Sequence, residues 1–199
     1  MAHLYLDTSN GLQIGLLNSD FEWINFKKVE TKRTSDIVHS EISKILSGES
    51  VEIMDLESVI LMAGPGSYTG MRVAEGVAQV LELEGVKIYS FHSFRIPEFL
   101  KIENYHWCYP AFKGEVHVND GKESKLLMKE DFLSFVKGGE SPYCITHGDN
   151  EVLEFCSVNT EDSLQNDSKL IFSSVVESDL RDRPFYFRPL DVEFKKSTK

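Results

Sequence analysis

A glycine-rich turn has the residue types and spacing best suited to chemistry; it comprises Gly64, Pro65, Gly66, Ser67, Tyr68, Thr69, Gly70, Met71 and Arg72. Glycine adopts positive φ without strain and proline restricts φ, so this composition predicts a tight backbone. The apolar run Val59–Ala63 precedes the turn, and a helical pattern starts at Thr69. The first N–H groups of a helix lack intrahelical partners, so the turn could bind an anion, with Ser67 or Thr69 as the helix cap.

The same turn has a simpler interpretation, as a sharp corner that presents the following helix to a partner. A glycine-x-glycine pattern alone is weak evidence for nucleotide binding, and no Gly-Lys-Ser/Thr follows it, which excludes a Walker-type loop. We favour the structural corner and keep a phosphate contact within a complex as the alternative. Within the turn, Arg72 is the residue whose contacts matter most for this choice.

Histidines and cysteines show no spacing typical of a metal site or a disulfide framework. The six histidines include no pair three to five residues apart, so there is no HxxxH helix, although a site assembled from distant histidines remains open. The cysteines, Cys108, Cys144 and Cys156, are odd in number, lie far apart and form no CxxC. We therefore predict no metal ligands, and we expect the cysteines to be reduced and mostly buried. This spacing also agrees with the absence of catalytic residues that the family resemblance described below implies.

The elements that position these residues follow from the periodicity of apolar side chains. In the first half, strands are predicted at 3–6, 12–17, 21–26, 55–63 and 86–91, and helices at 35–48, 69–84 and 93–100. The order strand, helix, strand over 58–91 is a βαβ unit. The strands at 59–62 and 86–91 should therefore be parallel neighbours, and with the opening meander they predict a mixed sheet.

The second half has a different texture, with short strands and turn signals. Strands are predicted at 107–112, 115–118, 125–128 and 143–146, with hairpin turns at Lys113-Gly114 and Asn119-Asp120-Gly121 and short helices at 131–136 and 173–180. The polar stretch Thr160–Lys169 is predicted to be a loop.

Size and composition limit the class of protein. The chain has 199 residues, 41% hydrophobic and 11% aromatic, enough for the core of one domain or two small lobes. Its 21 basic and 32 acidic side chains give a formal net charge of −11, which disfavours independent nucleic-acid binding. No basic segment precedes a long apolar core, and no apolar run reaches about 18 residues. We therefore expect a cytoplasmic protein without a membrane span.

Two amphipathic helices carry an apolar surface that we predict to face a partner. The helix over 69–84 is apolar over a wide arc, and Ala74, Gly76 and Ala78 would allow another backbone to approach closely. The helix over 35–48 has an apolar stripe of its own. The predicted interface comprises Val38, His39, Ile42, Ile45, Val73, Ala74, Val77, Val80 and Leu81.

Taken together, these segments resemble the TsaB (YeaZ) family of bacterial proteins. The turn Gly64–Arg72 is similar to the family signature G-P-G-S-F/Y-T-G-L/M-R at a strand-to-helix junction. Leu6-Asp7-Thr8-Ser9 resembles the family's first strand and turn, and His39-Ser40 matches the H-S that introduces its first helix. The hairpin Ala111–Val116 lies where relatives usually read D-A-R-x-x-E-V-Y, and Pro184–Arg188 resembles their closing P-x-Y-L-R.

The resemblance implies an α/β fold of the actin-like (ASKHA, ribonuclease H-like) class. Such a fold has a mixed β-sheet with flanking helices, in two related lobes of which the second is here reduced. On this basis we expect an N-terminal lobe at residues 1–102 that carries the partner or dimer helices. Residues 103–199 would form a smaller C-terminal lobe with a charged tail.

The family is needed for the threonylcarbamoyl modification of adenosine in tRNA, so the resemblance implies an inactive paralogue that serves as an essential subunit, not an enzyme. Such a subunit would pair with a TsaD-type transferase, its metal-carrying paralogue, and a TsaE-type ATPase would be the third member. Alone, the chain would form a homodimer through the same surface, and it would meet tRNA only through the complex. No cofactor is expected on this chain alone; ATP or ADP at the partner interface, and contact of the basic residues of Arg181–Lys199 with tRNA, stay open.

An enzymatic alternative also remains, namely a stand-alone actin-like ATPase or kinase, or a glycopeptidase-like enzyme. Asp7 lies where actin-like ATPases hold magnesium through water, and Asp149, after His147-Gly148, could supply a second carboxylate. Both are also ordinary turn residues at strand ends, and no clear second phosphate loop is present, so we favour a structural role for Asp7. Tight ATP binding by the isolated chain would favour the enzymatic alternative.

Overall fold

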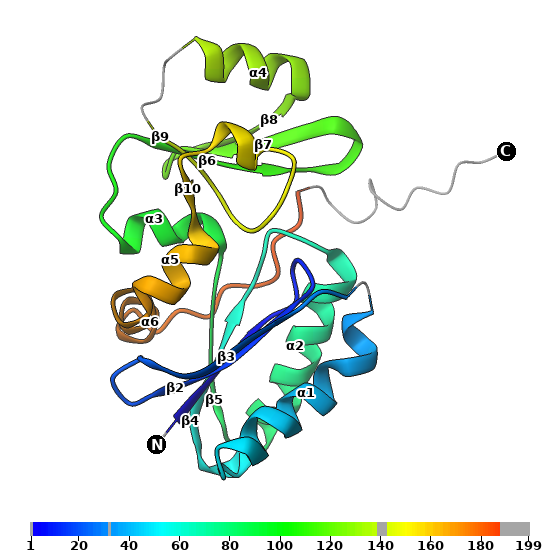
Figure 1. Cartoon of the computed structure of the whole chain (residues 1–199), viewed down its shortest axis with the longest axis vertical. Coiled ribbons are helices and arrows are strands. Elements are labelled where there is room, and N and C mark those ends of the chain that lie inside the picture. The colour runs from blue at the N-terminus through cyan, green and yellow to red at the C-terminus, as the bar shows by residue number, and fades with distance from the viewer. Residues whose placement is uncertain (1, 32, 139–142, 188–199) are drawn as a thin grey trace, which may run out of the picture.

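Two five-stranded β-sheets, arranged one above the other along the long axis, form the frame of the molecule (Figure 1). The structure is a computed structural model that describes residues 2–31, 33–138 and 143–187. The first sheet contains β1 (Ala2–Asp7), β2 (Leu12–Asn18), β3 (Trp23–Val29), β4 (Leu56–Met62) and β5 (Lys87–Phe91). The second contains β6 (Tyr105–Pro110), β7 (Glu115–Asn119), β8 (Ser124–Met128), β9 (Tyr143–Thr146) and β10 (Val158–Asn159). The helices are α1 (Thr34–Gly48), α2 (Tyr68–Leu83), α3 (Ile96–Phe99), α4 (Lys129–Lys137), α5 (Thr160–Asn166) and α6 (Ser168–Glu177).

The first sheet has the strand order β3-β2-β1-β4-β5. Strands β1, β2 and β3 are antiparallel neighbours, whereas β4 runs parallel to both β1 and β5. The predicted meander, the parallel βαβ unit and the mixed sheet are therefore confirmed. The buried strands β1 and β4 read as nearly continuous apolar runs because helices cover both faces of this sheet.

The second sheet repeats this arrangement with shorter strands. Its order is β10-β9-β6-β7-β8, with β6, β7 and β8 antiparallel and with β9 parallel to both β6 and β10. Reading β6 to β10 in place of β1 to β5 gives the same topology in both sheets. This repetition confirms the expected actin-like fold class, with two related lobes and a reduced second one.

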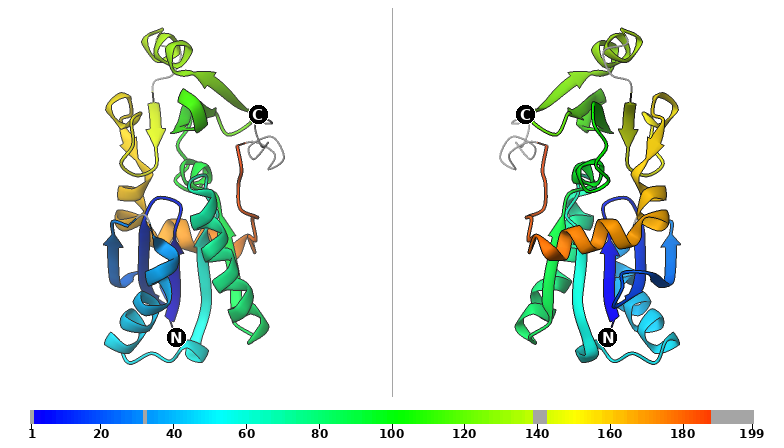
Figure 2. Two further views of the ribbon diagram at one scale, coloured as in Figure 1. Left: turned by 90° about the vertical axis from the view of Figure 1, so that its right-hand side faces the viewer. Right: turned by 90° about the vertical axis from the view of Figure 1, so that its left-hand side faces the viewer.

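Helices cover both faces of the first sheet, as the two side views show (Figure 2). On one face α1 and α2 enclose a core with Leu4, Leu6 and Val59. On the other face α6 and α3 enclose a second core around Tyr5 and Ile60. Helix α6 follows the second sheet in the chain but packs on the first, and the segment after it returns to the second sheet, where Phe187 packs against Tyr109. The division at residue 102 remains a prediction.

The segment Thr160–Lys169 is helical, so the predicted loop is wrong there. Asn159 caps α5 by accepting a hydrogen bond from Glu161 N at 3.1 Å, and Leu164 is completely buried in the second core. Only one large apolar side chain faces inward from this polar stretch, so the sequence pattern was too weak to indicate a helix. The final helix also starts earlier than predicted, at Ser168, and β3 is displaced to Trp23–Val29.

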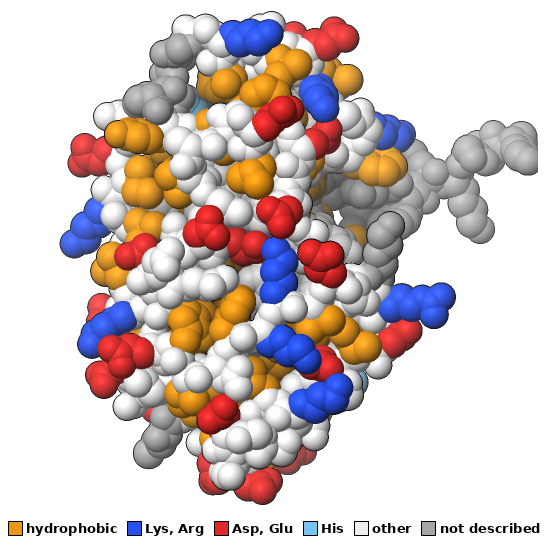
Figure 3. Space-filling view, viewed as in Figure 1, with side chains coloured by type: hydrophobic (Ala, Val, Ile, Leu, Met, Phe, Trp, Pro, Cys, Tyr) orange, Lys and Arg blue, Asp and Glu red, His pale blue; other side chains and the backbone are white. Residues whose placement is uncertain are grey.

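Acidic and basic side chains are mixed over the face shown in Figure 3, with small apolar patches between them. The negative net charge is therefore not gathered into one patch on this face, and no basic stripe crosses it. None of the helices within the described residues combines the length and the apolar character needed to span a membrane. The charged tail from Arg188 onward lies outside the described residues.

Candidate functional site

The glycine-rich turn packs directly against the turn between β1 and β2. Ser67 N donates to Ser9 O at 2.7 Å, and Thr8 Oγ1 donates to Gly70 O at 2.7 Å. A Cβ atom on Gly70 would overlap the carbonyl of Thr8, and one on Gly66 would overlap Ser9. These two glycines are therefore needed for the close approach of two backbones.

The N-terminus of α2 is capped from within the same turn. Ser67 Oγ accepts from Gly70 N at 3.2 Å, which satisfies one of the unpaired N–H groups of the first turn. The Arg72 guanidinium is exposed, hydrogen-bonds the Tyr68 hydroxyl and lies 5.4 Å from the centre of the Tyr68 ring. The Ser67 hydroxyl and the Arg72 guanidinium therefore make contacts within the protein. The phosphate contact in a complex remains a prediction.

The C-terminal segment runs along the edge of the first sheet and past the glycine-rich turn. Ser90 on β5 accepts from Asp182 N at 3.0 Å, and Phe185 N donates to Ala63 O at 2.9 Å, next to the turn. The Tyr186 ring then lies 5.0 Å from the Tyr68 ring. Three segments far apart in sequence, those at Asp7, Gly64 and Pro184, therefore meet at one end of the first sheet.

A buried chain of polar side chains connects Asp7 to the second lobe. His147 Nε2 lies 3.3 Å from Asp7 Oδ2, and His147 Nδ1 lies 2.9 Å from Thr160 Oγ1. Asp7 also accepts from Ser9 N at 2.7 Å. The side chains of Asp7 and His147 are at most 1% exposed, and Thr160 is fully buried. The arrangement joins the end of β1 to the end of β9.

Asp149, the second carboxylate considered with Asp7, has different partners. It is exposed, and its Oδ2 lies 3.6 Å from Lys28 Nζ. Lys28 also contacts Glu161 Oε2 at 2.8 Å. Burial lowers the pKa of Lys28, but its bonds to Glu161 and Asp149 outweigh this, so the pKa is raised. Among the described residues, no group of three His, Cys, Asp or Glu side chains is arranged to hold a metal ion.

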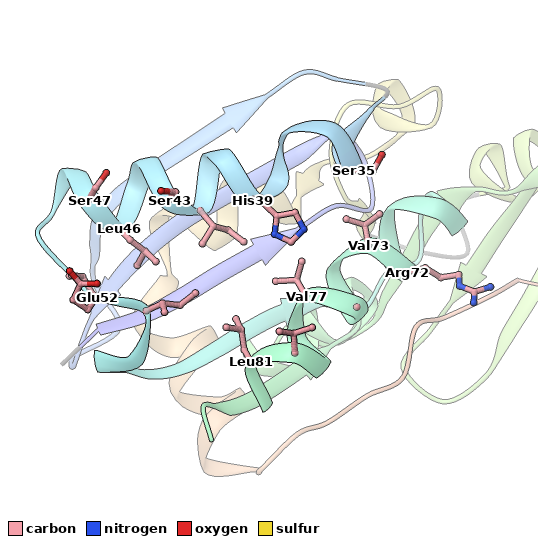
Figure 4. Close-up of a pocket in the computed structure, with 15 residues that line it drawn as sticks. Ser35, His39, Ser43, Leu46, Ser47, Glu52, Arg72, Val73, Val77 and Leu81 are labelled. Carbon is pink, nitrogen blue, oxygen red and sulfur yellow. The ribbon is translucent and has the colours of Figure 1, made fainter. Parts of the chain in front are cut away.

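An apolar groove lies between α1 and α2, on the side of the first sheet opposite α6 (Figure 4). Its volume is about 720 Å³. Val73, Val77 and Leu81 of α2 face His39 and Leu46 of α1 across the groove. The remaining lining residues are Ser35, Ile42, Ser43, Ser47, Val51, Glu52, Ile53, Arg72, Gly76 and Val80.

The predicted interface residues divide into core and surface. Six belong to the core between the helices and the sheet, each at most 8% exposed: Val38, Ile42, Ile45, Ala74, Val77 and Leu81. His39 and Val80 are exposed at the groove, Val80 by 59%, and Val73 is half-buried. A charge at Val77 or Leu81 would therefore disturb folding, whereas Val80 is open to a partner.

Sequence reasoning found His39 but missed the serines beside it in the groove, and it missed the histidine between the lobes. Ser35, Ser43 and Ser47 lie at four-residue spacings from one another or from His39 along α1, so a stripe of small polar side chains beside the apolar stripe was the available signal. His147 had no such signal, because its partner Asp7 lies 140 residues away in the chain.

Part of the chain is similar in sequence to a protein of known pathway. The tRNA threonylcarbamoyladenosine biosynthesis protein TsaB of Bacillus subtilis (strain 168) is 37% identical over 86 residues. That match spans 41% of this chain and 36% of the Bacillus protein. No family model matches the chain.

Two solved structures share the fold over nearly the whole chain. YeaZ from Pseudomonas aeruginosa superimposes with a TM-score of 0.65 at 16% identity, covering 94% of this chain and 99% of that one. An uncharacterized protein with similarity to peptidase YEAZ, also from Pseudomonas aeruginosa, gives a TM-score of 0.64 at 16% identity over the same shares. The chain is therefore similar in sequence to a TsaB protein over part of its length, and it shares the fold of YeaZ over nearly the whole chain.

Proposed function

We propose that this protein is a non-catalytic subunit that pairs with a TsaD-type transferase and supports threonylcarbamoyl transfer to N6 of adenosine 37 in tRNAs that read codons beginning with adenine. The observation that carries the proposal is the apolar groove between α1 and α2, on a chain whose sequence matches a TsaB protein. A TsaE-type ATPase completes the complex, which works on tRNA in the cytoplasm.

The groove has the shape and chemistry of a helix-docking surface. Its floor is apolar, its α1 wall carries serines and His39, and Gly76 on the opposite wall has no atom within 4 Å of the position a Cβ would take. Gly76 therefore leaves room for a partner's side chain to lie against the α2 backbone. Burying Val80, which is 59% exposed, would add apolar contact area. Its short side chain would lose little conformational entropy on burial. In the complex, a pair of helices of the transferase occupies this groove. When the transferase is absent, a second copy of this chain occupies it.

Arg72 lies at the end of the groove near the glycine-rich turn (Figure 4). In the complex this guanidinium is the group of this chain offered to ATP or ADP at the partner interface. Its planar set of donors suits a phosphate. Within the turn, Ser67 N and Gly70 O are already bonded to Ser9 and Thr8, so they are not free to contact the nucleotide.

The enzymatic alternative meets a physical obstacle at its best candidate residues. Asp7, His147 and Thr160 have the composition of an acid–base–nucleophile chain. All three are at most 1% exposed, however, and Thr160 Oγ1 donates its proton to Thr146 O at 3.1 Å. A substrate would have no path to this hydroxyl without separation of the lobes, so the chain of contacts suits a structural tie better than peptidase or ATPase chemistry.

Reconstituted tRNA modification tests the proposal. The transferase and the ATPase from the same organism are combined with tRNA and the threonylcarbamoyl donor, with and without this chain. We expect modified adenosine only when the chain is present, and we expect no ATP turnover or peptide cleavage by the chain alone. Full modification without the chain, or turnover by the chain alone that Asp7→Ala abolishes, would overturn the proposal.

A further inference from the structure

Two cysteines that are distant in the sequence lie together in the second lobe. Cys144 on β9 and Cys156, just before β10, place their Sγ atoms 2.8 Å apart. Both side chains are partly exposed. A disulfide brings the sulfurs to about 2.05 Å, so only a small movement of the two side chains separates this contact from a covalent bond.

The backbone holds the two cysteines in register. Ser157 N donates to Cys144 O at 2.8 Å, and the Ser157 hydroxyl bonds the same oxygen at 3.3 Å. Val158 then pairs with Ile145 in the parallel contact of β10 with β9. The pairing of β10 with β9 therefore holds the backbones of the two cysteines side by side.

A third thiol makes the pair chemically unequal. Cys108 on the neighbouring strand β6 is fully buried, and its thiol lies 3.5 Å from His106 O. Hydrogen bonds from the thiols of Cys108 and Cys156 lower the pKa of Cys144, while the bond to Cys144 and burial raise the pKa values of the other two. A thiolate is the nucleophilic form of cysteine, and Cys144 is partly exposed and in contact with Cys156, whereas Cys108 is buried, so we take Cys144 as the attacking sulfur.

We propose that Cys144 and Cys156 form a redox-active dithiol that a hydroperoxide oxidises to an intramolecular disulfide, while Cys108 stays a free thiol. The Cys144 thiolate attacks the peroxide and an S–O bond forms as the O–O bond breaks, giving a sulfenic acid. With hydrogen peroxide the leaving group is hydroxide, which takes up the proton that Cys144 released on ionising and becomes water. The Cys156 sulfur then attacks Cys144, the S–O bond breaks, and the departing hydroxide takes the Cys156 proton as a second water. In all, the protein loses two protons and two electrons, and these reduce the peroxide.

The disulfide would link the two ends of the segment between Cys144 and Cys156. This segment makes contacts with the first lobe. His147 in this segment bonds Asp7, and Asp149 O accepts from Asn10 Nδ2 at 3.5 Å. Oxidation would thus restrict the motion of the segment that contacts the first lobe, and reduction would remove this restriction.

Counting thiols in the full-length protein tests this site. The folded chain is treated with hydrogen peroxide, denatured, alkylated and weighed, and its peptides are mapped. We expect a loss of two of the three alkylatable thiols, a Cys144–Cys156 cross-linked peptide, and recovery of all three thiols after dithiothreitol. The control Cys108→Ala should lose both of its remaining thiols in the same way.

Single substitutions separate the two sulfurs. Cys156→Ser should stop at a sulfenic acid on Cys144 that dimedone traps, and Cys144→Ser should keep its two thiols. Circular dichroism tests whether each variant is folded. If Cys144→Ser is not folded, the peptide map of the oxidised wild-type protein shows which cysteines are linked. Three thiols remaining after peroxide, a cross-link that contains Cys108, or a disulfide only between two chains would each overturn the proposal.

Discussion

His147 Nε2 lies 3.3 Å from Asp7 Oδ2, and this contact joins the ends of one strand from each lobe. Thr160 donates its single hydroxyl proton to Thr146 O, so His147 Nδ1 must donate to Thr160 Oγ1. Both side chains of the pair are at most 1% exposed, so water cannot replace either partner, and the contact is sensitive to the loss of Asp7 or His147.

Replacing Asp7 tests whether its contact with His147 stabilises the fold. Asp7→Ala leaves His147 and Ser9 N without their buried partner and should destabilise the protein by about 3–5 kcal/mol. Asp7→Asn keeps an oxygen for Ser9 N and offers an N–H to a neutral His147, so it should cost no more than about 1 kcal/mol. Urea denaturation measures both, and equal, small losses would show that the contact contributes little.

Two glycines of α2 should respond to alanine in opposite directions. Gly70→Ala puts a Cβ into the Thr8 carbonyl and should destabilise the fold by about 2–4 kcal/mol. Gly76→Ala meets no atom within 4 Å and should stabilise the helix by about 0.5–1 kcal/mol. Thermal unfolding of the two variants gives the comparison. A tolerated Gly70→Ala would mean that the two turns are not in backbone contact.

His117 should make the stability of the protein fall in mild acid. It is buried among Phe94, Trp107, Phe185 and Phe187, neither ring nitrogen has a hydrogen-bond partner within the described residues, and burial lowers its pKa to about 4 from 6.5. Between these values the unfolded chain binds a proton that the folded one does not. Stability is therefore complete above about pH 6.5 and falls by up to about 3 kcal/mol as the pH drops to 4.

The matched variant His117→Phe isolates this contribution. It fills the same apolar site without a titratable group, so the difference between its urea denaturation curve and that of the wild type should change with pH. Parallel pH profiles for the two proteins would contradict a buried, neutral His117.

The opening meander, the parallel pairing of β4 with β5 and the position of the glycine-rich turn could be predicted from the sequence, because long apolar runs and turn residues act locally. The predicted loop at Thr160–Lys169 was wrong because the burial of Leu164 and the cap at Asn159 depend on tertiary contacts. Cys144 and Cys156 were treated as separate buried thiols for a similar reason, since only the pairing of β9 with β10 brings them together.

Apolar periodicity also could not separate core from interface in the candidate site. Val77 and Val80 are both apolar residues of one helix, yet Val77 is 8% exposed and Val80 is 59% exposed. The wide apolar arc of α2 indicated that some of its residues are open, but which ones depends on how deeply the sheet and α1 cover the helix. The glycines of the turn were recognisable, whereas their purpose, contact with Thr8 and Ser9, required the fold.

The most direct test of the proposed function is the affinity of this chain for the TsaD-type transferase from the same organism. Val80→Glu puts a charge on the exposed wall of the groove, and Gly76→Arg fills it without meeting any atom of this chain near its Cβ. Leu170→Glu is the control, because Leu170 is a 44% exposed residue of α6, on the opposite face of the sheet. Titration calorimetry should show Kd unchanged for the control and weakened at least about 100-fold, or about 2.7 kcal/mol, for both groove variants. Folded groove variants that bind the transferase as tightly as the wild type would contradict the account.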